Sequence, residues 1–231
     1  MTATQPGDVA GPGGAGGAGG EGRAATGRPG VAAFDFDGTL TQRDTLLPFL
    51  RRACGSMRVA RAALTAARRT RERDAFKVAL ISGLFRGWPA ERLDALGRAY
   101  VPNLVGVLRP ESLDRARWHR RQGHTVVIVS ASLGAYLRPF ADHCDLDGAL
   151  AVELVTDAGG TLTGEVVGAL NTRGPEKVAR LRAWLDARFG PGTDVELWAY
   201  GDSSGDDELL ATADHPTWVG RRARLGRRPR V

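Results

Sequence analysis

Short apolar runs that end in polar residues alternate along the chain with segments of helical periodicity. Such runs predict buried strands, and three have this form: residues 31–34, 125–129 and 195–200. Apolar residues recur at helical spacing in three further segments: roughly 108–122, 132–143 and 174–189. Strands that alternate with helices predict an α/β fold, in which helices cover both faces of a mostly parallel sheet.

Two segments have a different pattern. Residues 52–105 are helical in character and rich in Arg and Ala, with a helix expected over 90–100. We interpret 52–105 as a helical cap inserted into a core that comprises 31–51 and 106–220. Residues 150–167 alternate apolar and polar positions, which predicts a hairpin that forms a flap beside the core.

The two ends of the chain differ in composition from this globular middle. Residues 1–30 hold 11 of the 31 glycines and almost no bulky apolar side chains, so we predict a disordered Gly/Ala-rich leader. Residues 221–231 form a basic tail with six Arg and no acid, which accounts for the whole net charge of +6. The simplest interpretation is a solubilising end. A peripheral contact with an anionic membrane stays open, whereas nucleic acid binding is not expected because no aromatic residues are interleaved.

Several classes of protein are excluded or disfavoured. No window approaches the roughly 20 apolar residues of a membrane span, and the first residues lack the pattern of a secretory signal. Cys54 and Cys144 are far apart in the sequence, so we predict a reduced, cytoplasmic protein. The four histidines lack the spacing of a zinc site, which needs four coordinating groups.

The first strand ends in an acidic motif, Asp35-Phe36-Asp37-Gly38-Thr39. Two close carboxylates repel one another unless a cation lies between them, and oxygen ligands suit Mg²⁺. A carboxylate can also attack phosphorus, and a neighbouring carboxyl group can then act as general acid and base. Taken alone, the motif is more often an acidic turn than a catalytic site.

Later polar residues also follow predicted strands or begin helices. Ser130 ends an apolar run, where its hydroxyl and the following amides, at the start of a helix, suit phosphate oxygens. Lys177 lies at a helix start, where an inward-facing cation would neutralise phosphate and carboxylates. Asp202 and Asp206 follow the run 195–200 and are candidates for a metal ligand and its support. Because the carboxyl ends of parallel strands form one edge, we expect these residues to meet there.

These motifs, in this order, resemble those of the haloacid dehalogenase superfamily. They are Asp-x-Asp-Gly-Thr at 35–39, a Ser after an apolar strand at 130, a Lys at 177, and Gly-Asp-Ser-x-x-Asp at 201–206. The resemblance covers about residues 31–220. It implies a Rossmann-like, mostly parallel sheet core with an inserted helical cap of the C1 type.

The resemblance also implies roles for the motif residues. Asp35 would be nucleophile and metal ligand, and Asp37 would be the general acid/base and ligate Mg²⁺ through its backbone carbonyl. Asp202 would be the other metal ligand, with Asp206 supporting the metal shell. Two residues would bind the phosphoryl group: Ser130 and Lys177.

Within the superfamily, the chain resembles subfamily IB, the phosphoserine-phosphatase-like branch, through 162–164, 174–177 and Asp44. The family's phosphoserine phosphatases place a Glu at the position of Asp44 to meet the substrate amine. They also carry an Arg on a cap helix for the substrate carboxylate. Here the corresponding segment offers Lys77, and Ile81 occupies the position expected for Arg, which does not favour phosphoserine.

The leading hypothesis is Mg²⁺-dependent hydrolysis of a small phosphorylated metabolite through an aspartyl-phosphate intermediate. Phosphoserine phosphatase proper is one alternative. A lipid-phosphate phosphatase at a membrane surface is another, because the cap and the tail are rich in Arg. A receiver-like phospho-acceptor domain is the non-enzymatic alternative. The sequence leaves the oligomeric state open.

Overall fold

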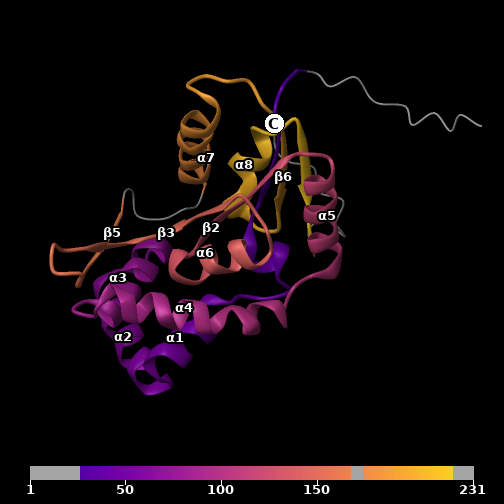
Figure 1. The fold of residues 1–231 in the computed structure, drawn as a ribbon. Coiled ribbons are helices and arrows are strands. Elements are labelled where there is room, and N and C mark those ends of the chain that lie inside the picture. The colour runs from indigo at the N-terminus through magenta and orange to yellow at the C-terminus, as the bar shows by residue number, and fades with distance from the viewer. Residues whose placement is uncertain (1–26, 168–173, 221–231) are drawn as a thin grey trace, which may run out of the picture.

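The computed structural model describes residues 27–167 and 174–220. Within them, five strands form one sheet in the order β3-β2-β1-β6-β7, and every neighbouring pair is parallel (Figure 1). The strands are β1 (Gly30–Phe34), β2 (Thr125–Leu133), β3 (Gly148–Val152), β6 (Glu196–Gly201) and β7 (His215–Trp218). This architecture confirms the predicted α/β fold with a parallel, Rossmann-like sheet.

The apolar residues of the central strand are buried on both faces of the sheet. Ala32 and Phe34 belong to one hydrophobic cluster, and Val31 and Ala33 belong to the other. Helices α5 (Pro110–Arg121) and α6 (Gly134–His143) contribute to the first cluster, while α7 (Pro175–Phe189) and α8 (Asp207–Ala211) contribute to the second. Because both faces are covered, the strand reads as a continuous apolar run.

Two features of the sheet differ from the sequence prediction. The helix expected over 132–143 begins at Gly134, because β2 continues and pairs Leu133 with Val152. Strand β7 was not predicted. It is four residues long and contains Pro216, which an edge strand tolerates because one side of it needs no partner.

Four α-helices lie between the first strand and α5. They are α1 (Leu46–Cys54), α2 (Ser56–Arg69), α3 (Arg73–Phe85) and α4 (Ala90–Val105). Figure 1 shows α1, α2 and α3 together at one end of the molecule. The predicted boundary at residue 52 falls inside α1, and α4 continues five residues beyond the expected end at 100. The assignment of 52–105 as a separate cap stays a prediction.

Helix α4 joins these helices to the core by a close contact with α6. A Cβ at Gly97 would lie 1.9 Å from the carbonyl oxygen of Ala135, so only glycine allows this approach. The hydroxyl of Tyr100, one turn further, donates to the carbonyl oxygen of Thr45 at 3.3 Å. The helical segment is therefore packed on α6, which in turn contacts β2 and β3 of the sheet.

The predicted hairpin is shorter than expected. Residues 148–152 form edge strand β3 of the main sheet, and the antiparallel hairpin comprises β4 (Leu154–Thr156) and β5 (Leu162–Val166). The hairpin contacts the end of α3. Leu162 exchanges backbone hydrogen bonds of 2.8 Å with Gly87 and Trp88, and the Ser82 hydroxyl donates to the Gly164 carbonyl oxygen.

The last residues of the expected leader are ordered. The guanidinium of Arg28 pairs with Asp194 at 2.8 Å and with Asp214 at 3.2 Å, and Gly30 begins β1. The remainder of the leader, 1–26, and the basic tail, 221–231, lie outside the described residues. Among the described helices, none has the length and apolar character to cross a membrane. The cytoplasmic location stays a prediction.

Candidate active site

A cleft of about 350 Å³ opens where β1, β2 and β6 end, and α3 faces it from the other side. Its lining includes every residue selected from the sequence: Asp35, Asp37, Asp44, Ser130, Lys177, Asp202 and Asp206. The structure therefore brings together side chains from positions up to 171 residues apart.

The turn after β1 places two of these carboxylates. The Asp35 amide still donates to the carbonyl oxygen of Tyr200 in β6 at 2.9 Å, so Asp35 is fixed at the edge of the sheet. The chain then turns through Gly38, whose φ of +86° favours glycine. A Cβ at Gly38 would lie 2.2 Å from a carboxylate oxygen of Asp202. Glycine is thus required both by the turn and by the approach of Asp202.

Lys177 lies at the centre of the charged cluster. Its side chain is buried, and Nζ donates to Asp35 Oδ1 and to Asp206 Oδ1, each at 2.5 Å. Burial lowers the pKa of Lys177, but the two carboxylates outweigh this effect and the net shift is upward. Lys177 therefore stays protonated and holds Asp35 in one orientation.

Asp206 is fully buried and fully engaged by hydrogen-bond donors. Its Oδ2 accepts from the Asp202 amide at 3.2 Å and from the amide and hydroxyl of Ser203 at 2.9 and 3.0 Å. Its Oδ1 accepts from Lys177. Because these donors occupy both oxygens, Asp206 is suited to shaping the loop after β6 rather than to binding a ligand directly.

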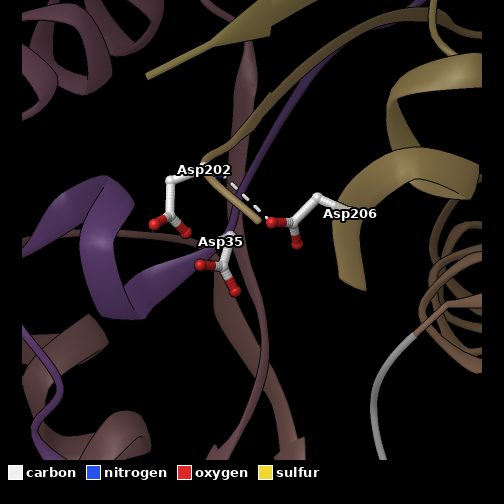
Figure 2. A group of neighbouring side chains, drawn as sticks. All are labelled: Asp35, Asp202 and Asp206. Atoms are coloured by element: carbon white, nitrogen blue, oxygen red, sulfur yellow. Dashed lines mark hydrogen bonds between the residues drawn. The ribbon is translucent and has the colours of Figure 1, made fainter. Parts of the chain in front are cut away.

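Asp35 and Asp202 have the oxygen ligands that a hard divalent cation needs, and Asp206 lies beside them as support. Asp35, Asp202 and Asp206 each offer an oxygen, and these atoms lie within 4.8 Å of one another. Figure 2 shows the three carboxyl groups close together, with that of Asp35 between those of Asp202 and Asp206. Burial raises the pKa of Asp35 to about 7 and that of Asp202 to about 6, although Lys177 opposes both shifts. Two carboxylates that resist ionisation together in an all-oxygen site are a suitable environment for Mg²⁺.

Asp37 points toward α1 and β2. Its Oδ1 accepts from the amide and hydroxyl of Thr45 at 2.8 and 2.7 Å, and its Oδ2 accepts from the Ser132 hydroxyl at 2.5 Å. Burial raises the pKa of Asp37, and the bonds from Ser132 and Thr45 counteract this. The Thr45 hydroxyl in turn contacts the phenol oxygen of Tyr136 at 3.2 Å. The sequence analysis missed both Thr45 and Ser132. Ser132 could have been selected because it is a polar residue that follows an apolar run.

Ser130 lines the cleft, but its local setting differs from the prediction. It was expected at a helix start, whereas α6 begins four residues later. The register between β2 and β3 shifts between Val129 and Leu133, as in a β-bulge. Bulges commonly redirect side chains next to functional sites, and Ser130 lies in this irregular stretch. Its Oγ accepts from the Ser132 amide at 3.2 Å.

The side of the cleft opposite the sheet carries cations from α3. Arg73 and Lys77, one turn apart, both line the cleft. Burial lowers the pKa of Lys77, while Asp37 and Asp44 raise it. Ile81 is 0% exposed and packs in the hydrophobic core, so it does not contact the cleft. The sequence offered Lys77 as the one cation of this segment, and it missed Arg73, which lines the cleft one turn earlier.

Asp44 is exposed and has a structural contact of its own. Its Oδ1 accepts from the amide of Leu47 at 3.1 Å, as a residue that caps the start of α1 does. It lines the same part of the cleft as Lys77. Asp44 therefore lies beside the cleft, and its hydrogen bond to Leu47 explains its position without a role in substrate binding.

The fold is similar to solved structures of low sequence identity. A protein of unknown function from Bordetella pertussis Tohama I superposes with a TM-score of 0.64 at 22% identity, covering 86% of this chain and 94% of that one. A phospho-aspartyl intermediate analogue of phosphoserine phosphatase gives a TM-score of 0.53 at 20% identity, covering 80% and 84%. At these identities the similarity establishes the fold alone.

Sequence comparison identifies the family. Protein CicA of Caulobacter vibrioides is 38% identical over 196 residues, which are 80% of this chain and 84% of that protein. The family model of haloacid dehalogenase-like hydrolases matches residues 32–211. This match contains β1 from its third residue, the helices α1–α4 and the whole acidic cluster from Asp35 to Asp206. The arrangement at the strand ends is therefore that of a known hydrolase family, and the chain belongs to the haloacid dehalogenase-like hydrolases.

Proposed function

We propose that this chain is a Mg²⁺-dependent phosphatase that hydrolyses a small phosphomonoester through an aspartyl-phosphate on Asp35. The observation that carries the proposal is the buried ammonium of Lys177 between Asp35 and Asp206, with the carboxylate of Asp202 nearby. Among the described residues, Asp35 Oδ2 and the Asp202 carboxylate accept no hydrogen bond. Asp35 Oδ2 is therefore free to attack phosphorus, and the Asp202 carboxylate is free to bind a cation.

In the first step, a carboxylate oxygen of Asp35 attacks phosphorus and the bond from phosphorus to the ester oxygen breaks. Asp37, in its protonated form, gives its proton to the departing alkoxide. The raised pKa of Asp37 favours that protonated form. In this proposal Lys177 and Ser130, which both line the cleft, bind the phosphoryl oxygens.

In the second step, the Asp37 carboxylate takes a proton from water, and the water oxygen attacks the phosphorus of the aspartyl-phosphate. Inorganic phosphate leaves and Asp35 is regenerated. The hydrogen bonds from Thr45 and Ser132 stabilise the charged form of Asp37 that this step needs. Asp35, Asp202 and the backbone carbonyl of Asp37 would hold Mg²⁺, which would supply positive charge to offset the charge of the phosphoryl oxygens.

The cations of α3 support a substrate with a second acidic group. Arg73 and Lys77 line the cleft on the side where the leaving group of the ester would lie. Asp44 is nearby and suits a substrate amine. Phosphoserine, which carries a carboxylate and an amine, is therefore a second candidate, although the cations come from positions other than Ile81.

The decisive experiment compares Asp35→Asn with a matched control, Asp114→Asn, on the exposed surface of α5. With Mg²⁺ and p-nitrophenyl phosphate, we expect release of phosphate by wild type and the control, and none by Asp35→Asn. Brief incubation with a ³²P-labelled substrate followed by acid quenching should label wild type but not Asp35→Asn. Full activity of Asp35→Asn would refute the mechanism. A stable label on wild type without turnover would instead favour the phospho-acceptor alternative.

A further inference from the structure

Helix α2 exposes large apolar side chains on the face that points away from the protein. Met57 is 71% exposed and Leu64 is 63% exposed, seven residues apart. On the opposite face, Val59 and Ala66 have the same spacing and are buried. Residues seven apart lie on one side of a helix, so α2 has an inner apolar stripe that packs and an outer one that does not.

The surface around this outer stripe is strongly basic. Between Asp44 and Glu72 the chain has no acidic residue. The same stretch has seven exposed arginines: Arg51, Arg52, Arg58, Arg61, Arg68, Arg69 and Arg71. Within the described part of the chain, none of them forms an ion pair. Arg58 is the one with a contact to the body of the protein, donating to the carbonyl oxygen of Leu84 at 3.1 Å.

Arginine and apolar positions are interleaved on the outer face of α2. Arg61 follows Met57 by four residues, and Arg68 follows Leu64 by four. Met57, Arg61, Leu64 and Arg68 therefore lie along one line of the helix. We call these four residues the outer stripe. Figure 1 shows α2 at the edge of the molecule, far from the labelled strand β6 and helix α8.

We propose that the outer stripe of α2 binds the surface of an anionic phospholipid bilayer. A helix with aliphatic side chains between arginines lies in the plane of such a surface, with the apolar groups at the boundary of headgroups and acyl chains. The arginines then contact lipid phosphates, and their long stems add apolar contact. This proposal concerns binding alone and does not depend on the proposed phosphatase chemistry.

The chemistry of the stripe disfavours other occupants. A second copy of the chain would bring the same basic surface against itself, and like charges would repel. Nucleic acid would match the charge but not Met57 and Leu64, which have no aromatic face for bases. Trp88, whose ring lies beneath Arg58 and Arg92, is buried and offers no exposed face for a base.

The outer stripe lies close in sequence to the helix that lines the cleft. Only residues 70–72 separate α2 from α3, and α3 begins with Arg73, which lines the cleft. A protein bound through α2 would hold the cleft close to the lipid headgroups. The inference therefore predicts where the protein meets its surroundings, whichever substrate it hydrolyses.

The test is co-sedimentation of the full-length protein with vesicles of phosphatidylcholine, with and without phosphatidylglycerol. The charge variant is Arg61→Glu/Arg68→Glu. Its matched control, Arg121→Glu/Arg182→Glu, makes the same change in net charge at exposed positions of α5 and α7. The apolar variant is Met57→Ser/Leu64→Ser. Far-ultraviolet circular dichroism and thermal melting verify that each variant is folded.

We expect wild type to bind vesicles that contain phosphatidylglycerol and not vesicles of phosphatidylcholine alone. The charge variant should lose affinity by about 30-fold or more, because each arginine near an anionic surface contributes about fivefold. The control should stay within about threefold of wild type, since its charges are distant from the bilayer. The apolar variant should lose about tenfold, and its remaining binding should disappear at lower salt than that of wild type.

Three results would overturn the proposal. One is the absence of binding by wild type to anionic vesicles. Another is equal loss by the charge variant and its control, which would assign binding to overall charge or the basic tail. The third is displacement from vesicles by single-stranded DNA together with full binding by the apolar variant, which would identify a nucleic acid surface.

Discussion

Replacement of Gly38 by alanine should disable the metal site while leaving the fold intact. Gly38 has φ +86°, and the Cβ of an alanine would lie 2.2 Å from one carboxylate oxygen of Asp202 and 2.9 Å from the other. Atoms of this kind need at least about 3 Å. Because the obstruction is the end of a short side chain, Asp202 can rotate away. Rotation relieves the clash by removing Asp202 from its place opposite Asp35.

Gly38→Ala is expected to have two effects: a loss of stability from the backbone conformation and a loss of activity from the displacement of Asp202. An L-residue in the left-handed region costs about 1–2 kcal/mol. For a chain of this size that corresponds to a fall in melting temperature of about 2–4 °C per kcal/mol. The oxygen of Asp202 must move by about 1 Å to reach an ordinary contact distance, and a displacement of that size can reduce a rate by about 100-fold. We therefore expect a small loss of stability and a large loss of activity.

Gly123→Ala is the matched control. Gly123 has φ +74° in the turn after α5, and a Cβ there would have no atom within 4 Å. It shares the backbone strain of Gly38→Ala without the collision. Melting temperature, Mg²⁺ affinity by isothermal titration calorimetry, and phosphate release should be measured for both. The reasoning would be refuted if Gly38→Ala bound Mg²⁺ and turned over like Gly123→Ala, because Asp202 would then tolerate displacement.

Further variants test the charges and hydrogen bonds of the site. Lys177→Met removes the cation between Asp35 and Asp206 and should destabilise the metal-free protein by about 3–5 kcal/mol at neutral pH. The pKa of Asp35 is raised, so the folded state binds more protons than the unfolded state does. The stability of Lys177→Met, measured by urea denaturation, should therefore increase as the pH falls. The affinity of wild type for Mg²⁺ should rise between about pH 5 and pH 8. Asp35 and Asp202, with pKa values of about 7 and about 6, must lose their protons to bind the ion. An affinity that does not change with pH would contradict this. Ser132→Ala should lower kcat by about tenfold or more with little change in KM, because a hydrogen bond to charged Asp37 is lost. Arg73→Ala should raise KM by about tenfold or more for phosphorylated amino or hydroxy acids and leave KM for p-nitrophenyl phosphate unchanged. An equal effect on both substrates would show that Arg73 does not bind a second acidic group of the substrate.

The sheet was predictable because its strands are buried on both faces. Residues 31–34 and 126–129 are uninterrupted apolar runs, and an acidic residue or a serine follows each at the carboxyl end. Strand β7 lacked this signal, because it is an edge strand with Pro216 and exposed positions. The continuation of β2 to Leu133 was equally invisible, since Ser130 and Ser132 interrupt the apolar pattern there.

The acidic cluster followed from the same logic, because parallel topology brings strand ends together whatever their distance in sequence. Asp35 and Asp202 each follow a strand and Ser130 lies in the last part of β2, so their meeting needed no knowledge of side-chain contacts. Thr45 and Ser132 could not be found in this way. Their contact with Asp37 depends on the turn at Gly38 and on the register shift in β2, and neither is encoded in a hydrophobic pattern.

The side of the cleft formed by α3 illustrates the deeper limit of sequence reasoning. Arg73, Lys77 and Ile81 recur every fourth residue and lie on neighbouring parts of one helix, yet Arg73 and Lys77 line the cleft and Ile81 is buried. What separates them is tertiary packing, because the β4–β5 hairpin and the Gly87–Trp88 backbone fix the far end of α3. Periodicity specifies which residues share a side of a helix but not where along that side a neighbouring element ends. The residues expected to select the substrate are therefore determined by contacts between α3 and the hairpin, and substitutions there should change substrate preference without touching Asp35.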